Sequence, residues 1–229
     1  MQAFPQIWAR RWVLLLAVAT CGPVASRAEA SQLVVGDYAD GYAESPNGNG
    51  TFTFVNTTDM AIRQFTNTVI DRSIANFNLS ALPSNAAISS VSLEFNITSY
   101  TSNAGRVVDV LGFDTTGGVT VADATVAASS LGSYNSFNLG LGAQTISLSA
   151  STLKTLLGGS SIVGLRFQGD SETVNTSIGS RSQPFTPQPT LVINYTTPEP
   201  ASIISALLAV VCLGGYCWRR SALANRALA

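Results

Sequence analysis

Val91-Ser-Leu-Glu-Phe-Asn-Ile-Thr98 alternates strictly between apolar and polar residues. Successive side chains of a β-strand point to opposite faces, so a strand here has its apolar side chains on one face and its polar ones on the other. Strands with one buried and one solvated face are typical of antiparallel sheets. The stretch therefore predicts an antiparallel β domain whose hydrophobic core lies on one side of this strand.

Weaker alternation continues this pattern along the chain, with turn-forming residues in between. The alternating stretches are Ala75–Leu79, Ile146–Ser149, Val163–Gln168 and Leu191–Tyr195. Turn formers gather at Pro46–Gly50, Pro83–Asn85, Thr115–Gly118, Gly158–Ser160 and Gly169–Ser171. Strands interrupted at such intervals are typical of an all-β domain.

Ser151–Leu157 departs from the strand pattern. Its leucines recur at helical spacing, a serine can cap its beginning and Gly158 can end it, so we expect one short helix there. Because strands do not alternate regularly with longer helices, a parallel α/β fold is not expected. We predict an all-β fold, an antiparallel two-sheet β-sandwich of jelly-roll-like form, over residues 31–197.

Residues 1–30 have the pattern of a secretory signal peptide. A basic pair precedes the apolar run Trp12–Ala19, and Ala28 and Ala30 provide the small residues of a cleavage site. A lipoprotein signal is the alternative, because Cys21 follows the apolar run, but the threonine before it stands where such signals have Gly or Ala. We expect export through the Sec translocon.

Residues 198–229 form a second terminal segment with three parts. Pro198-Glu199-Pro200 is followed by the uncharged, apolar run 201–218, and then by Arg219 and Arg220. A run of this length just suffices for one helical membrane crossing, which takes roughly 20 residues. Because excess Lys and Arg stay on the cytoplasmic side, we expect the C-terminus inside and residues 31–197 outside.

The composition of residues 31–197 excludes several classes of function. Acidic residues outnumber basic ones there, which argues against a nucleic-acid partner, because phosphates are neutralised by clustered Lys and Arg. The chain has no histidine, and Cys21, Cys212 and Cys217 all lie in the terminal segments. A Ser-His-Asp or Cys-His centre, a His-ligated zinc and a disulfide framework are therefore not expected in this domain.

The order of the three C-terminal parts resembles the PEP-CTERM sorting signal. The resemblance implies recognition by an exosortase, a membrane-embedded protease of Gram-negative bacteria that make exopolysaccharide, which cuts near Pro198-Glu199-Pro200. It implies a protein in the inner membrane with its body in the periplasm before processing, and at the cell surface or in the extracellular matrix afterwards. The basic stop Arg219-Arg220 halts translocation. The motif then lies at the membrane–water boundary on the outer side of the inner membrane, within reach of such a protease. A permanently anchored membrane protein is the alternative if the tail is never cut.

A less specific resemblance covers much of the domain. Arg72–Pro83, followed by Ala87–Phe95, is similar to the start of a DNRLRE-type β-sandwich, although Asn78 stands where that family has Asp. Similar opening loops and closing strands are found at Asp37–Tyr42, Asn47–Gly50, Val163–Phe167 and Pro189–Tyr195. Residues 100–140 have no counterpart in it. Some sandwiches of this kind bind carbohydrate and others are spacers, so the resemblance implies a fold rather than an activity.

Acidic residues near the start of the domain are candidate metal ligands. Asp37, Asp40 and Glu44, with backbone carbonyls, offer the oxygen ligands that Ca²⁺ takes in irregular geometry. Their spacing matches no defined calcium loop, and solvated surface carboxylates are the simpler interpretation. No other cofactor is expected.

Other side chains invite weaker hypotheses. Asp170 and Glu172 are the nearest approach to the paired carboxylates of a glycoside hydrolase, but acidic turn residues are ordinary. Phe52 and Phe54 alternate in a strand-like run and are expected to be buried. Arg72 is expected to pair with Asp71 or with a distant carboxylate. Sugar-stacking candidates among the loops are Tyr38, Tyr42, Tyr100 and Tyr134.

We therefore predict an exported, non-catalytic surface or extracellular-matrix protein that acts in exopolysaccharide or biofilm organisation or in adhesion. Its expected partners are the exosortase, the Sec translocon, the membrane before processing, and exopolysaccharide. The alternative is a carbohydrate-binding module or a polysaccharide-active enzyme. A cleft with two carboxylates at hydrolase separation would favour the enzyme.

Overall fold

The computed structural model describes residues 29–65, 67–100, 107–170, 174–183, 186–197 and 208–215. The sheet lies in a compact unit of residues Ala30–Thr196, and the helical residues 208–215 belong to a separate unit. None of the helices in these ranges has the length and apolar character needed to cross a membrane. Ala28, Pro198-Glu199-Pro200, Arg219 and Arg220 lie outside the described residues, whereas Ala30 is an exposed residue of the first strand.

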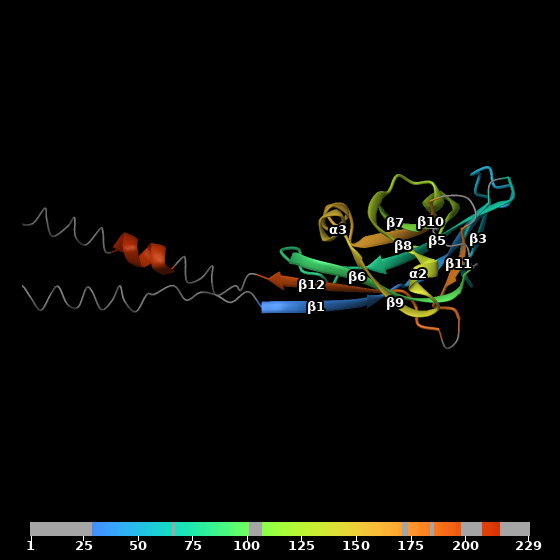
Figure 1. The fold of residues 1–229 in the computed structure, drawn as a ribbon. Helices are drawn as coiled ribbons and strands as arrows, with labels where there is room; N and C mark the ends of the chain where they lie inside the picture. Colours follow the sequence, from blue (N-terminus) through green and yellow to red (C-terminus); the bar gives the residue numbers. More distant parts are fainter. Residues whose placement is uncertain are drawn as a thin grey trace, which may run out of the picture. The chain divides into compact units, whose positions relative to one another are not determined.

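Antiparallel strands dominate the compact unit, as the sequence predicts (Figure 1). They are β1 Glu29–Gly36, β2 Ala39–Ser45, β3 Phe54–Asn56, β4 Met60–Phe65, β5 Val69–Asn78, β6 Ala87–Tyr100, β7 Val107–Asp114, β8 Ser129–Asn135, β9 Gly142–Leu148, β10 Ile162–Gly169, β11 Val174–Ile178 and β12 Thr190–Thr197. They form one sheet in the order β1-β12-β6-β11-β4-β5-β10-β7-β8, with β2 and β9 also paired to β5 and β6, and β3 to β2.

The sheet curls because its two longest strands each pair with several others. β6 pairs with β9 along one edge, and with β12 and then β11 along the other. β5 pairs with β2 along one edge, and with β4 and then β10 along the other. The pairing of β11 with β4 joins these two groups of strands. In Figure 1, β12, β6 and β9 consequently lie in one layer, with β5, β10 and β7 in the other.

The core lies between these strands and confirms the predicted faces of β6. Its apolar residues Val91, Leu93, Phe95 and Ile97 are buried, whereas the polar residues between them are half-buried or exposed. The same core cluster contains buried side chains of β5, β10 and β12, among them Phe77, Phe167 and Leu191. Burying each side chain of this size stabilises the fold by about 1.5–3 kcal/mol.

The predicted helix is present, but the expectation of a single short helix is wrong. α3 covers Ala150–Leu156, one residue earlier than predicted, and the Ser149 side chain caps it by accepting from the Thr152 amide at 3.2 Å. Two further short helices, η1 Val121–Ala124 and α2 Ser136–Leu139, fall within residues 100–140, for which the sequence offered no resemblance. Local capping forms them: Asp123 accepts from the Thr120 amide at 2.8 Å, and Asn135 caps α2.

The expected burial of both phenylalanines in the Phe52–Phe54 run is also wrong. Phe54 is 52% exposed, because β3 is a short strand that pairs only with β2 among the described strands. Phe52 is half-buried and packs against a second, smaller core cluster formed by Ala43, Ile74, Phe113 and Ala124. That cluster fills the space between the outer face of the sheet and η1.

Candidate functional site

The corner between β1 and β2 places Asp37 and Asp40 together. β1 ends at Gly36 and β2 begins at Ala39, so only two residues connect these strands. The Asp37 amide donates to the Pro189 carbonyl at 3.0 Å, and the Tyr38 amide donates to the Asn76 carbonyl at 2.9 Å. These bonds fix the corner between the beginning of β12 and the end of β5.

Asp40 is buried, and each of its carboxylate oxygens accepts a hydrogen bond. The Ser180 hydroxyl donates to one carboxylate oxygen at 3.0 Å, and the Arg181 backbone amide donates to the other at 2.6 Å. Ser180 is itself buried, in the loop that follows β11. The two donors hold the Asp40 carboxylate against this loop.

Asp37 is equally buried, but neither of its carboxylate oxygens has a hydrogen-bond partner. Burial raises the pKa of Asp37 to about 8, with a further increase from the neighbouring Asp40 carboxylate and an opposing effect of Arg181. Two adjacent carboxylates cannot both stay ionised in a buried site without compensation. Either a shared proton or a bound cation must therefore offset their repulsion.

A hollow with a volume of ≈ 420 Å³ opens beside Asp40. Its wall includes Thr57, Gly118, Val119, Arg181 and Ser182. The Ser182 hydroxyl donates to the Thr57 carbonyl at 3.3 Å, which ties the loop after β11 to the one after β3. The hollow gives water access to Asp40, one of the two carboxylates of the Asp37–Asp40 pair.

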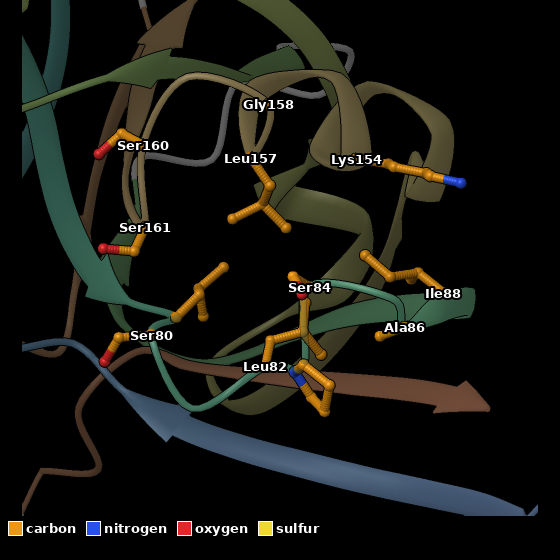
Figure 2. Close-up of a pocket in the computed structure, with 12 residues that line it drawn as sticks. Ser80, Leu82, Ser84, Ala86, Ile88, Lys154, Leu157, Gly158, Ser160 and Ser161 are labelled. Carbon is orange, nitrogen blue, oxygen red and sulfur yellow. The ribbon is translucent and has the colours of Figure 1, made fainter. Parts of the chain in front are cut away.

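A second hollow, of ≈ 470 Å³, lies between the turn that follows β5 and the end of α3 (Figure 2). Figure 2 shows Leu157 pointing into it, with Ser80 and Ser161 together on one side, while the Lys154 side chain extends away. Among the described residues of its lining, Lys154 is the only charged one. The paired carboxylates required for glycoside hydrolysis are thus not part of this wall.

The remaining candidates are not brought together. Glu44 forms an ion pair with Arg63 at 3.5 Å, so it does not join the Asp37–Asp40 pair. Asp170 accepts from the Val107 amide at 3.3 Å, and Glu172 lies outside the described residues. Within the described ranges, no three or more His, Cys, Asp or Glu side chains gather as a metal-binding group.

Arg72 does not take the carboxylate partner that the sequence suggests. Its guanidinium donates to the Ala124 carbonyl and stacks over the Phe52 ring, 4.9 Å from the ring centre. The acid that precedes it, Asp71, pairs instead with Arg63. The arginine therefore holds η1 against the sheet through a backbone oxygen.

Sequence reasoning missed Arg166 altogether. This residue of β10 is only 6% exposed, and it donates to the carbonyls of Asp123 at 3.0 Å and Val126 at 2.9 Å. Burial, together with the nearby Arg72, lowers the pKa of Arg166 to about 10. The sequence feature that could have indicated it is a single arginine inside the apolar run 163–167. A charged side chain buried at such a position requires a hydrogen-bond or ion-pair partner.

Comparison with known proteins adds no assignment: no family model and no curated protein matches the chain.

Proposed function

We propose that the chain is an exported, non-catalytic surface or extracellular-matrix protein that is sorted by its C-terminal tail and cleaved at Pro198-Glu199-Pro200 by an exosortase. The observation that carries the proposal is the position of the motif relative to the sheet. β12, the last strand, ends at Thr197, directly before Pro198. A cut at the motif therefore falls just beyond the last backbone that the sheet needs.

The distribution of core residues supports the same proposal. Among the described residues, the last buried apolar side chain in the chain is Ile193. Removal of residues 198–229 takes none of the described core away. At the other end, cleavage after Ala30 removes only the first two residues of β1 and leaves Ser31–Gly36.

For the released body we propose the DNRLRE-like, two-sheet sandwich of jelly-roll-like form, with a role in exopolysaccharide organisation or adhesion. Buried side chains of β6, β12, β5 and β10 belong to one core cluster, which supports a sandwich of two sheets. The body reaches the periplasm through the Sec translocon, stays on the inner membrane until the tail is cut, and then passes to the cell surface or matrix.

Expression of the full chain in a host that carries an exosortase tests the proposal. Intact mass and fractionation are compared between the wild type and the triple variant Pro198→Ala, Glu199→Ala, Pro200→Ala. We expect the wild type to lose its tail and to reach the medium or matrix, and the variant to stay full-length in the inner membrane, because the protease then lacks its recognition sequence.

A matched control changes the tail without changing the motif. Ser202→Ala with Ser205→Ala keeps the apolar run apolar and should be processed like the wild type. Processing of the triple variant at the wild-type rate, or a wild type that stays full-length and membrane-bound beside a processed reference substrate, would refute sorting through this motif.

A further inference from the structure

The Asp37–Asp40 pair places two carboxyl groups inside the fold without enough donors or positive charge to compensate them. Asp37 is 4% exposed and Asp40 is 3% exposed, and both oxygens of Asp37 lack a donor. A carboxylate that folding removes from water needs a donor, a proton or a cation. The Arg181 side chain is exposed and acts on Asp37 only through its charge, while its backbone amide donates to Asp40.

The surroundings of the pair are rich in oxygen atoms. Asp40 keeps lone pairs on both oxygens after accepting its two hydrogen bonds, and Asp37 has all of its acceptor capacity free. The buried Ser180 hydroxyl and the Pro189 carbonyl belong to the same corner. The hollow beside Asp40 has room for the water molecules that complete a coordination shell.

We propose that Asp37 and Asp40 bind one Ca²⁺ ion at the corner between β1 and β2. Calcium takes six to eight oxygen ligands in flexible geometry, including carboxylates, backbone carbonyls and water, which matches an irregular corner of this kind. Magnesium demands near-ideal octahedral geometry. Zinc and the later transition metals favour His and Cys ligands, and the chain has no histidine.

The ion has a structural role, because the corner contacts residues about 140 to 150 positions later in the sequence. Asp40 accepts from Ser180 and Arg181 of the loop after β11, and the Asp37 amide donates to Pro189 before β12. A cation here cross-links the β1–β2 corner to these segments. Calcium sites of extracellular modules bind with Kd on the order of 10⁻⁴–10⁻³ M, and we expect that range. The site does not depend on how the protein is exported or cut.

Calorimetric titration of the full-length chain in mild detergent with CaCl₂ after chelator treatment tests the proposal, together with denaturant unfolding with and without Ca²⁺. We expect binding of one Ca²⁺ per chain. At a free Ca²⁺ concentration of about 100 Kd, the unfolding equilibrium constant should fall about 100-fold, because the ion binds only the folded state. MgCl₂ in place of CaCl₂ should give at most a tenth of that change.

Two carboxamide variants assign the effect to the pair. Asp37→Asn replaces a buried carboxyl that has no hydrogen-bond donor, so without Ca²⁺ it should unfold at the same or a higher denaturant concentration than the wild type, and it should not respond to Ca²⁺. Asp40→Asn should also lose the response, but it should be less stable, because its amide nitrogen meets the donors of Ser180 or Arg181. Asp114→Asn, which changes an exposed aspartate, is the matched control and should respond like the wild type.

The wild type alone keeps the test decisive even if a variant folds poorly. Absence of both binding heat and stabilisation up to 10 mM Ca²⁺, about ten times the weakest expected Kd, would overturn the site. If Asp37→Asn bound Ca²⁺ with wild-type affinity, the ion would bind elsewhere in the protein, and its assignment to the Asp37–Asp40 pair would be overturned. An equal response to Mg²⁺ would overturn the choice of calcium.

Discussion

At the scale of single residues, Asp71 makes the stability of the fold depend on pH. This carboxyl is fully buried on β5, where Arg63 donates to one oxygen and the other oxygen has no partner. Burial raises the pKa of Asp71 to about 6, although the Arg63 guanidinium acts in the opposite direction. In the unfolded chain an aspartate titrates near 3.9.

The sign of the effect follows from these two values. Between about pH 4 and pH 6 the folded state holds more of this proton than the unfolded state, so the free energy of unfolding decreases as the pH rises through that window. Above it the contribution is constant. We predict that the wild type loses more stability between pH 4.5 and pH 7 than Asp71→Asn does, as measured by urea unfolding at each pH.

The comparison with Asp71→Asn isolates this group, since Asp37 and every other titrating residue are the same in both proteins. Glu44→Gln is a useful second variant, because Glu44 pairs with the same arginine and lies directly opposite Asp71 in the β2–β5 register. It should leave most of the pH dependence in place. Parallel stability curves for the wild type and Asp71→Asn would contradict a raised pKa at this position.

Single residues also show how far the candidate site could be predicted. The sequence indicated Asp37 and Asp40 as possible ligands from residue type alone, and the structure places them together in the described corner. The sequence analysis also grouped Glu44 with these two residues, because it is close to them in the chain. That grouping is wrong, because the strand register places Glu44 beside Arg63. The loop donors Ser180 and Arg181, some 140 residues away, could not be found from spacing, because only the fold brings them to Asp40.

At the scale of strands, β10 and β7 depend on a glycine where they pair. Gly164 lies directly opposite Phe113, and a methyl group added to it would lie within 2.8 Å of three carbons of the Phe113 ring. Phe113 is buried in the smaller core cluster and cannot move without opening it. We predict that Gly164→Ala lowers the free energy of unfolding by about 1–3 kcal/mol, as expected for overpacking, measured by denaturant titration.

Gly118→Ala is the matched control for that substitution. Nothing lies within 4 Å of a methyl group added to Gly118, which is an exposed turn residue, so its effect should stay within about 0.5 kcal/mol. If Gly164→Ala and Gly118→Ala both unfolded at the same denaturant concentration as the wild type, the predicted overpacking against the Phe113 ring would be contradicted.

Strands with strong alternation were predictable, whereas strands of other composition were not. β6, β10 and β12 were found because apolar and polar residues alternate in them. β11 was missed, although its burial alternates equally well, because Thr176 is fully buried there and a hydroxyl residue does not count as apolar in the pattern. β2 is built largely from small and polar residues, so its burial arises from its position beside β5 and not from its own hydrophobicity.

At the scale of the whole molecule, the curl of the sheet could not be derived from the sequence. Local pattern predicts which segments are strands, but the junction of β11 with β4 pairs residues more than a hundred positions apart. The choice of such partners depends on the packing of the complete core. The all-β, antiparallel class was therefore predictable, and the strand order was not.

The whole molecule also allows a direct test of where the folded body ends. All of the described buried apolar residues lie between Tyr42 and Ile193, so a chain of residues 31–197 should unfold cooperatively at the same denaturant concentration as the full-length protein. A chain that ends at residue 189 lacks β12, and with it the fully buried Leu191 and Ile193 and the pairing partner of β1, so it should fail to fold. Circular dichroism and urea titration distinguish these cases. If residues 31–197 do not fold either, the body requires its tail, and a protease that cuts at Pro198-Glu199-Pro200 would release an unfolded chain.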